Sequence, residues 1–330
     1  MDLANRIGRR LRLQDLQVLM TVAQTGSMRK AAVLLHTTQP SVSRAIAELE
    51  QTTGVALLDR HSHGVEPTAC GRALLDGGTA VFDDLHQAVR NIEFLTDPTS
   101  GEVRLGSVPA FAPNFVTAAI DQFSQRYPRV RFEVVTGLVE TLHRHLLDRT
   151  IDLAISARFG RVATEDVDFQ FLFDGSFVVA AGATNPWSHR RKIALADLVN
   201  ERWALPSPES AVGSAFLKAF STSGVDYPSA IIIADAIEVR MGLLETGRFL
   251  TMFDPAVLRF PSQHRAIVAL PVALPIAVAP IGISTLNARA LSPVTKLFTE
   301  HARELAKRLT KKNGGVLARH RKHAMTSQRA

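Results

Sequence analysis

The segment from Thr38 to Gln51 constrains the fold most, because its apolar and polar residues separate onto two faces of one helix. Val42, Ile46 and Leu49 fall within about 60° of one another at roughly 100° per residue, which predicts a buried face. The opposite face carries small and polar residues and one arginine, Arg44. Small residues allow close approach to a DNA groove, and an arginine there can bond either a guanine edge or a phosphate. The pattern therefore predicts a DNA recognition helix.

Two further helices are expected before this segment, and a hairpin after it. Apolar residues from Leu16 to Ala23 recur at i, i+3, i+4 and i+7, and Gly26 ends that helix. A short second helix, Met28–Leu35, with Ser27 as its expected cap, leads through a tight turn to Thr38, the expected cap of the third helix. A strand, a hairpin tip and a returning strand are expected at residues 54–60, 61–64 and 65–67. This order predicts a winged helix-turn-helix.

The stretch from Leu13 to about Leu75 resembles, without a gap, the DNA-binding head of LysR-type transcription regulators. The most specific parts of the resemblance are Ala31-Ala32, Gln39-Pro40-Ser41-Val42-Ser43-Arg44, Leu49-Glu50, Gly54 and Leu57-Leu58-Asp59-Arg60. The resemblance implies a sequence-specific transcription regulator that binds double-stranded DNA. It also implies that five residues of the third helix face DNA: Gln39, Pro40, Ser41, Ser43 and Arg44. Further candidates are Arg29 in the second helix and, in the basic hairpin tip, His61 and His63, which stand where arginine is common in the family.

A long helix is expected after the wing, from its cap Thr68 to Thr96. Two sevenfold series alternate along it in steps of four and three residues: Leu74, Val81, Ala88 and Leu95, and Gly71, Gly78, Leu85 and Ile92. Such a seam is typical of a dimerising helix, and a reader of palindromic DNA needs two heads. Packing against its own chain is the alternative. The resemblance favours a homodimer or homotetramer, with RNA polymerase as a further partner.

The second half of the chain alternates strands and helices. The order from residue 103 to 156 predicts a parallel sheet, and a second such unit follows at 177–253. The layout resembles the two-lobed, periplasmic-binding-protein-like effector domain of LysR-type regulators, with lobes at 101–165 plus 268–310 and at 166–267. The expected fold class is α/β: a winged helix-turn-helix (1–67), a dimerising linker helix (68–97), a two-lobed effector domain (98–310) and a disordered basic tail (311–330).

Ligands of open α/β sheets bind at the carboxyl ends of the strands. Small or hydroxyl-bearing residues follow those ends here, and the candidate effector-binding residues are Ser107, Pro109, Ala110, Thr136, Ser156, Pro206 and Ser207. Their side chains and free helix N–H groups can hold a carboxylate or a hydroxyl. For each serine, helix capping is the alternative. A sugar, an aromatic acid and an amino-acid-like metabolite all remain open as the small-molecule effector.

The motifs give no support for an enzyme. The sequence contains no Walker loop, no G-x-S-x-G and no dinucleotide fingerprint. His143 and His145 stand at i and i+2 of an expected helix, so their rings diverge. We therefore expect no catalytic residue, no metal and no cofactor.

A solute-binding transport component with the same two-lobed fold is the alternative function. No secretory signal is apparent, and the single cysteine, Cys70, rules out an intrachain disulfide; both observations favour the cytoplasm. Cys70 itself is expected to be buried. The most apolar stretch, Ala266–Leu286, holds three prolines, which favour strands over a membrane span, and no membrane partner is expected.

The net charge of +7 comes from the end of the chain. Residues 301–330 hold nine lysines and arginines and one acid, Glu304, a net charge of +8. The charge is therefore weak support for DNA binding by the head. Two roles stay open for the tail: non-specific contact with DNA, or none.

Overall fold

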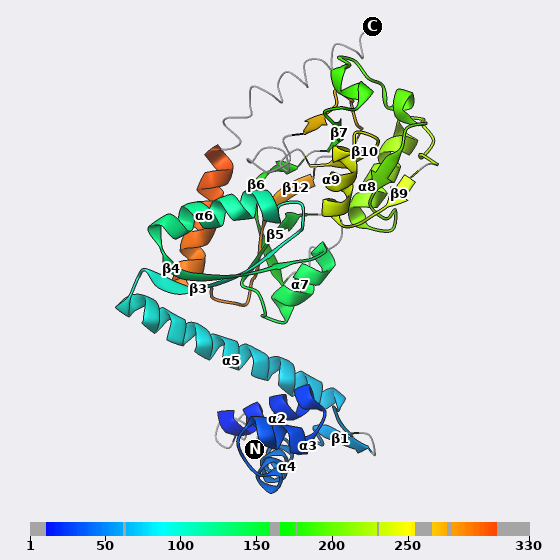
Figure 1. Ribbon diagram of the computed structural model, residues 1–330. Helices are drawn as coiled ribbons and strands as arrows, with labels where there is room; N and C mark the ends of the chain where they lie inside the picture. Colours follow the sequence, from blue (N-terminus) through cyan, green and yellow to red (C-terminus); the bar gives the residue numbers. More distant parts are fainter. Residues whose placement is uncertain are drawn as a thin grey trace. The chain divides into compact units, whose positions relative to one another are not determined.

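The computed structural model describes residues 11–61, 64–158, 166–175, 177–229, 231–254, 266–275 and 279–308. The chain forms two compact units, residues 1–89 and 90–330, and the boundary falls within the long helix α5 Ala69–Thr96 (Figure 1). Within the described ranges, no helix combines the length and the apolar character needed to cross a membrane.

Three helices form the core of the first unit: α2 Leu13–Thr25, α3 Met28–Leu34 and α4 Gln39–Thr53. Val42, Ile46 and Leu49 of α4 are buried in one apolar cluster with residues of α2 and α3. The predicted inner face of the third helix is confirmed, and its opposite face is left for the surface.

Local capping starts and stops these helices where the sequence predicts. The hydroxyl of Ser27 accepts the backbone N–H of Lys30, and that of Thr38 accepts the N–H of Ser41. Gly26 ends α2 with a φ of 63°, in the left-handed region that favours glycine. The turns are therefore encoded by the residues at the helix ends.

The wing consists of two antiparallel strands, β1 Leu58–His61 and β2 Gly64–Pro67. A carboxylate from α4 holds its base, because Glu50 Oε1 accepts the N–H of Leu57 at 2.8 Å and that of Leu58 at 3.3 Å. On the other strand, the N–H of Val65 donates to the carbonyl of Gly26 at 3.0 Å. The wing is thus tied both to α4 and to the turn between α2 and α3.

Helix α5 begins at its predicted cap and then lies close to the wing and α2. The hydroxyl of Thr68 accepts the N–H of Gly71 at 2.9 Å. A Cβ at Gly71 would lie 2.0 Å from the carbonyl oxygen of Leu57, and one at Gly78 would lie 3.0 Å from the side chain of Leu16. These two seam positions are therefore glycine because the helix packs closely against its own domain.

The predicted heptad seam divides into two parts. Leu74 packs against the core of the first unit, as do Gly71 and Gly78, so the self-packing alternative holds for the first turns of α5. The remaining seam positions are exposed: Val81, Leu85, Ala88, Ile92 and Leu95. Cys70, predicted to be buried, is exposed, because its neighbour Gly71 takes the inward position.

The first sheet of the second unit has the order β4-β3-β5-β12-β6. Its strands are β3 Ser100–Ser107, β4 Arg129–Thr136, β5 Leu153–Ala157, β6 Val167–Gly175 and β12 Ala279–Leu286. Strands β3, β4 and β5 are parallel, as predicted, while β12 runs antiparallel to its neighbours. A π-helical turn, η1 Ala112–Val116, leads into α6 Thr117–Arg126. Helix α6 and a last helix, residues 293–308, cover one face, and α7 Val139–Leu147 covers the other.

The second sheet has the order β11-β7-β10-β8-β9. Its strands are β7 Val178–Gly182, β8 Trp203–Leu205, β9 Ile231–Ile233, β10 Leu250–Phe253 and β11 Ile267–Ala269. Helix α8 Ala211–Thr222 packs on one face through Phe216 and Phe220, and α9 Ile237–Glu245 packs on the other. Two short 3-10 helices, η2 Pro186–His189 and η3 Leu195–Leu198, lie between β7 and β8.

The strand order differs from the predicted lobe boundaries. Strand β6 pairs with β12, so the segment predicted as lobe two, 166–267, begins with a strand of the first sheet. Strand β11 pairs with β7, so its residues belong to the second sheet although 268–310 was assigned to lobe one. The two predicted crossings occur, after β6 and after β11. The basic tail at 311–330 lies outside the described residues.

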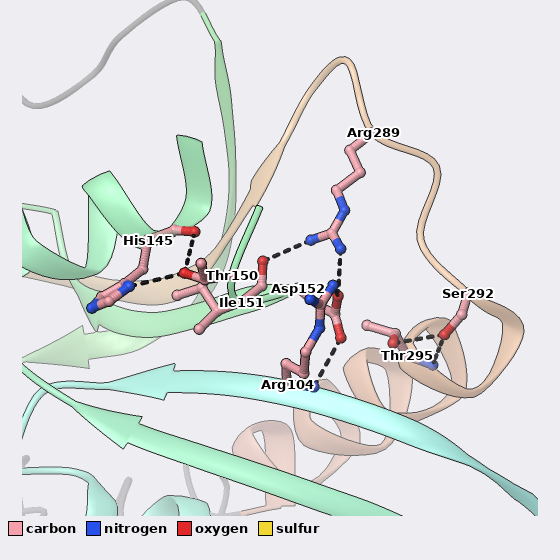
Figure 2. Close-up of polar contacts among 8 residues, drawn as sticks. All are labelled: Arg104, His145, Thr150, Ile151, Asp152, Arg289, Ser292 and Thr295. Carbon is pink, nitrogen blue, oxygen red and sulfur yellow. Dashed lines mark hydrogen bonds and ion pairs between the residues drawn. The ribbon is translucent and has the colours of Figure 1, made fainter. Parts of the chain in front are cut away.

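A buried ion cluster ties three segments of the first sheet together (Figure 2). Asp152, just before β5, accepts Arg104 and Arg289, each at 2.8 Å from its Oδ1. The Arg289 side chain is fully buried and also donates to the carbonyl of Ile151 at 2.6 Å. The backbone N–H of Arg104 donates to Asp152 Oδ2 at 2.8 Å. One carboxylate thus fastens β3, the start of β5 and the segment after β12.

Candidate nucleic-acid interface and ligand cavity

The outward face of α4 gathers five of the residues predicted to contact DNA. Gln39, Pro40, Ser41 and Arg44 are exposed, and Ser43 is half-buried. Their common position follows from the burial of the opposite face, because residues between the core positions of a helix must point away from the core. The face offers hydroxyl, amide and guanidinium donors to a ligand outside the protein.

The N-terminus of α4 adds an electropositive end to this face. Its first turn carries no acidic residue, and the hydroxyl of its cap Thr38 lies 2.9 Å from that of Ser41. A helix N-terminus whose first turn carries no acidic residue favours anions such as phosphate. Arg29 on α3 and His61 at the end of β1 are also exposed, whereas His63 lies outside the described residues. The first unit therefore presents hydrogen-bond donors from α3, α4 and the wing, and positive charge from Arg29 and Arg44.

A cavity of about 440 Å³ opens in the second unit, between residues of its two sheets. Such a volume falls in the range of roughly 300–1,000 Å³ that is usual for small-molecule sites. Its walls are mostly apolar and include Val108, Phe111, Leu138, Val139, Phe177, Val212, Ile237, Met252, Phe253 and Ile281. It lies beyond strand ends of both sheets, as the rule for open α/β sheets predicts.

Three of the seven predicted effector-binding residues line this cavity: Pro109, Ala110 and Pro206. The other four do not. Ser107 is fully buried, because β3 lies between β4 and β5, and its hydroxyl donates to the carbonyl of Val108 at 3.1 Å. Thr136 ends the edge strand β4 and is exposed, and it is not among the residues that line the cavity.

The last two predicted residues have other surroundings. Ser156 faces a separate, smaller cavity of about 40 Å³ with His143 and Arg158. The backbone N–H of Ser207 donates to Asp235 Oδ1 at 2.8 Å. The strand-end rule therefore finds the edge where the cavity lies, while the side chain that enters it depends on the alternation along each strand.

Sequence reasoning missed the charged residues of the cavity. Arg240 of α9 lines it, as do Asp254, Glu140, Glu209 and Asp235. A signal for Arg240 existed, because it follows Ile237 by three residues and so shares the inner face of α9. An arginine on the apolar face of a helix is a candidate for function, since charged side chains are almost never fully buried without a partner.

The Arg240 guanidinium is only partly satisfied within the described residues. Its Nη1 donates to the carbonyl of Met252 at 3.1 Å. Its Nε is buried and has no hydrogen-bond partner among the groups described. Burial lowers the pKa of Arg240 to about 10, and the charges of Asp235 and Glu238 oppose that shift. The side chain therefore remains a cation at neutral pH, held in an apolar wall.

The N-termini of two helices, α7 and α9, border the cavity. The caps of α7 and α9 are Leu138 and Ala236, which make no side-chain cap. The residues after them, Val139 and Ile237, line the cavity. Helix α8 is instead capped by Ser210, whose hydroxyl accepts the N–H of Gly213. The first turns of α7 and α9 already carry an acidic residue each, Glu140 and Glu238, which is the negative group that first-turn N–H groups favour.

Comparison with known proteins connects both regions to one family. Residues 13–72 match the family described as bacterial regulatory helix-turn-helix protein, lysR family, and residues 96–307 match the LysR substrate binding domain. The chain is 26% identical to HTH-type transcriptional regulator GbpR of Azospirillum brasilense, over 86% of this chain and 83% of that protein. It is 26% identical to HTH-type transcriptional regulator TdcA of Escherichia coli, over 80% and 84%.

Solved structures of full-length regulators share the fold. A full-length OxyR variant from Pseudomonas aeruginosa superposes with a TM-score of 0.65 at 18% identity, covering 89% of this chain and 95% of that one. CbnR, a LysR family transcriptional regulator, gives a TM-score of 0.53 at 20% identity, covering 89% and 100%. Since the two matched domains span most of the sequence, the chain belongs to the LysR family of DNA-binding transcriptional regulators with an effector-binding domain.

Proposed function

We propose that this regulator reads operator DNA with the exposed face of α4 and is controlled by a small molecule in the 440 Å³ cavity. The exposed positions of Gln39, Pro40, Ser41 and Arg44 support the first part. Small side chains at the start of the helix permit entry into the major groove, and the helix N-terminus favours phosphate. Ser43, Arg29, His61 and His63 complete the proposed DNA-contacting set.

We propose the cavity as the effector site because it is the feature that residues of both sheets build together. Pro109, Ala110 and Pro206 stay in the proposed site, and Arg240 joins it. We propose no catalytic role, because the proposed regulation needs only the binding of DNA and of a small molecule. Cytoplasmic location follows from the need to reach DNA.

The assembly is proposed to be a homodimer or homotetramer that engages RNA polymerase. The exposed seam positions of α5, from Val81 to Leu95, support a dimer, because exposed apolar residues at heptad spacing favour helix pairing. The proposed domains are the winged helix-turn-helix (1–67), the linker helix (68–97) and the effector domain, with sheets built from 100–175 plus 279–286 and from 178–269.

The test combines a thermal-shift screen of metabolites with operator titrations. A ligand of the native state raises its stability in proportion to RT ln(1 + [L]/Kd). Ala110→Trp should fill the cavity and abolish the thermal response, while operator affinity in the absence of metabolite stays at the wild-type value. Lys218→Trp, at an exposed position of α8, is the matched control and should respond as the wild type does. A full response in Ala110→Trp would move the effector site elsewhere.

A further inference from the structure

Resting on the proposed effector role of the cavity, we propose that its ligand is a small monocarboxylate with an apolar body, whose carboxylate binds Arg240. Arg240 is 6% exposed, and its Nε is buried without a hydrogen-bond partner in the described parts of the chain. A buried cation with an unused donor costs free energy unless an anion or an acceptor meets it. The guanidinium fork fits a carboxylate with two parallel bonds.

The cavity is also lined by a buried aspartate, which does not change the inference that the ligand is an anion. Asp254 is 7% exposed and lines the same cavity, but it already interacts with another group. Among the described residues, the buried charged group of the cavity that still has an unused hydrogen-bond donor is therefore the guanidinium of Arg240.

The walls of the cavity select the body of the ligand. Apolar side chains from both sheets and their helices line it, among them Phe111, Phe177, Ile237 and Met252. A sugar would lose hydrogen bonds to water there, because few polar groups replace them. An aromatic or branched aliphatic body instead gains from burial, at about 25 cal/mol per Å² of apolar surface.

Three further carboxylates limit the charge of the ligand. Glu140, Glu209 and Asp235 line the cavity and are exposed. Like charges repel a second negative charge on a ligand, and the repulsion grows as water leaves the site. The site therefore favours one carboxylate over a phosphate, which carries a charge of about −1.5 to −2 at pH 7, and over a dicarboxylate.

A matched set of probes tests the charge requirement in the wild-type protein. Isothermal calorimetry on the full chain should give binding heat with phenylacetate or 4-methylpentanoate. It should give at least roughly tenfold weaker binding with phenylacetamide and with phenyl phosphate, since a charge-assisted bond contributes more than a neutral one. Equal or tighter binding of the amide or the phosphate overturns the proposal, and so does the absence of heat from both carboxylates at 10 mM. This comparison needs no variant that must fold.

Variants then test the residue. Arg240→Gln should weaken carboxylate binding roughly tenfold or more, and Arg240→Lys, which keeps the charge but not the fork, should weaken it less. Arg248→Gln, at an exposed position just after α9, should bind as the wild type does. Wild-type affinity in a folded Arg240→Gln variant overturns the assignment.

Failure of the carboxylate proposal and failure of the proposed effector site give different experimental results. Binding of phenylacetamide or phenyl phosphate in preference to the acids, lost in Ala110→Trp, overturns the carboxylate and leaves the cavity as the effector site. A metabolite response that survives in Ala110→Trp, with no heat from any probe, overturns both.

Discussion

Arg44 stands on the exposed face of α4, one turn after Pro40, and its removal should weaken DNA binding without unfolding the head. The buried face of the helix is made by other residues, so the core is untouched. If Arg44 forks onto a guanine, Arg44→Ala should cost about 1–3 kcal/mol per half-site and relax the preference at one base pair. If it clamps a phosphate, affinity should fall on every sequence and the salt slope should drop by about one.

The measurement is a titration of operator and random duplex at two salt concentrations, with melting of the protein followed in parallel. Arg191→Ala, exposed in the second unit, is the control and should match the wild type. A folded Arg44→Ala protein with wild-type affinity for both duplexes would remove this residue from the DNA interface.

Asp152 sits at the centre of the buried ion cluster of Figure 2, so Asp152→Asn should destabilise the second unit. The fully buried Arg289 would lose a charged acceptor, and removing one partner of a buried pair costs about 3–5 kcal/mol. The bond from Arg289 to the carbonyl of Ile151 remains, which favours the lower end of that range. Chemical denaturation of both proteins gives the difference.

The exposed pair Glu304–Lys307, at 2.8 Å, supplies the control for this experiment. Glu304→Gln should leave the denaturation midpoint unchanged, because water screens exposed pairs. If the Asp152→Asn protein is as stable as the wild type, then the negative charge of Asp152 contributes no net stability to the fold.

At the scale of elements, α5 carries an apolar stripe that should form the dimer contact. Leu85 and Ile92 belong to the exposed part of the seam, seven residues apart. Replacing both by Glu places like charges opposite one another in a symmetric pair, so the protein should become monomeric and lose operator affinity. Analytical ultracentrifugation gives the mass. Asn91→Glu, an exposed polar position of the same helix, should leave the oligomer intact; a Leu85→Glu/Ile92→Glu dimer would place the interface elsewhere.

Elements whose signal is local were predicted well from the sequence. The caps Ser27 and Thr38 and the buried face of α4 are set by residues within one or two turns, and the structure confirms them. Strand β6 was missed because its partner β12 lies about a hundred residues further along the chain, and its burial does not alternate regularly. Its pairing is also interrupted by a bulge at Ile281 and Gly282.

The candidate site was predictable to the level of the sheet edge. Strand ends place Pro109, Ala110 and Pro206 at the cavity, while Ser107 is turned into the sheet. Arg240 was missed because the strand-end rule does not consider a helix residue that reaches the cavity only through tertiary packing. Its position three residues after Ile237 is the signal that would have found it.

At the scale of the whole molecule, two chain crossings join the sheets that enclose the cavity, one after β6 and one after β11. A ligand that contacts residues of both sheets stabilises one arrangement of them over others. Such a ligand can regulate DNA binding only if the DNA-bound and free states hold it with different affinities.

Reciprocity makes this regulation measurable from the cavity side. If the effector changes operator affinity by some factor, operator DNA must change effector affinity by the same factor. Allosteric couplings of about 1–3 kcal/mol correspond to changes in affinity of roughly 5–150-fold.

We expect calorimetric titration of the effector identified by the thermal screen to give a Kd shifted by such a factor when operator duplex is present. Random duplex should shift it less, because fewer contacts distinguish the states. The Arg44→Ala protein should show the shift only at DNA concentrations high enough to restore binding. An identical effector Kd with and without saturating operator would show that occupancy of the cavity is not coupled to operator affinity.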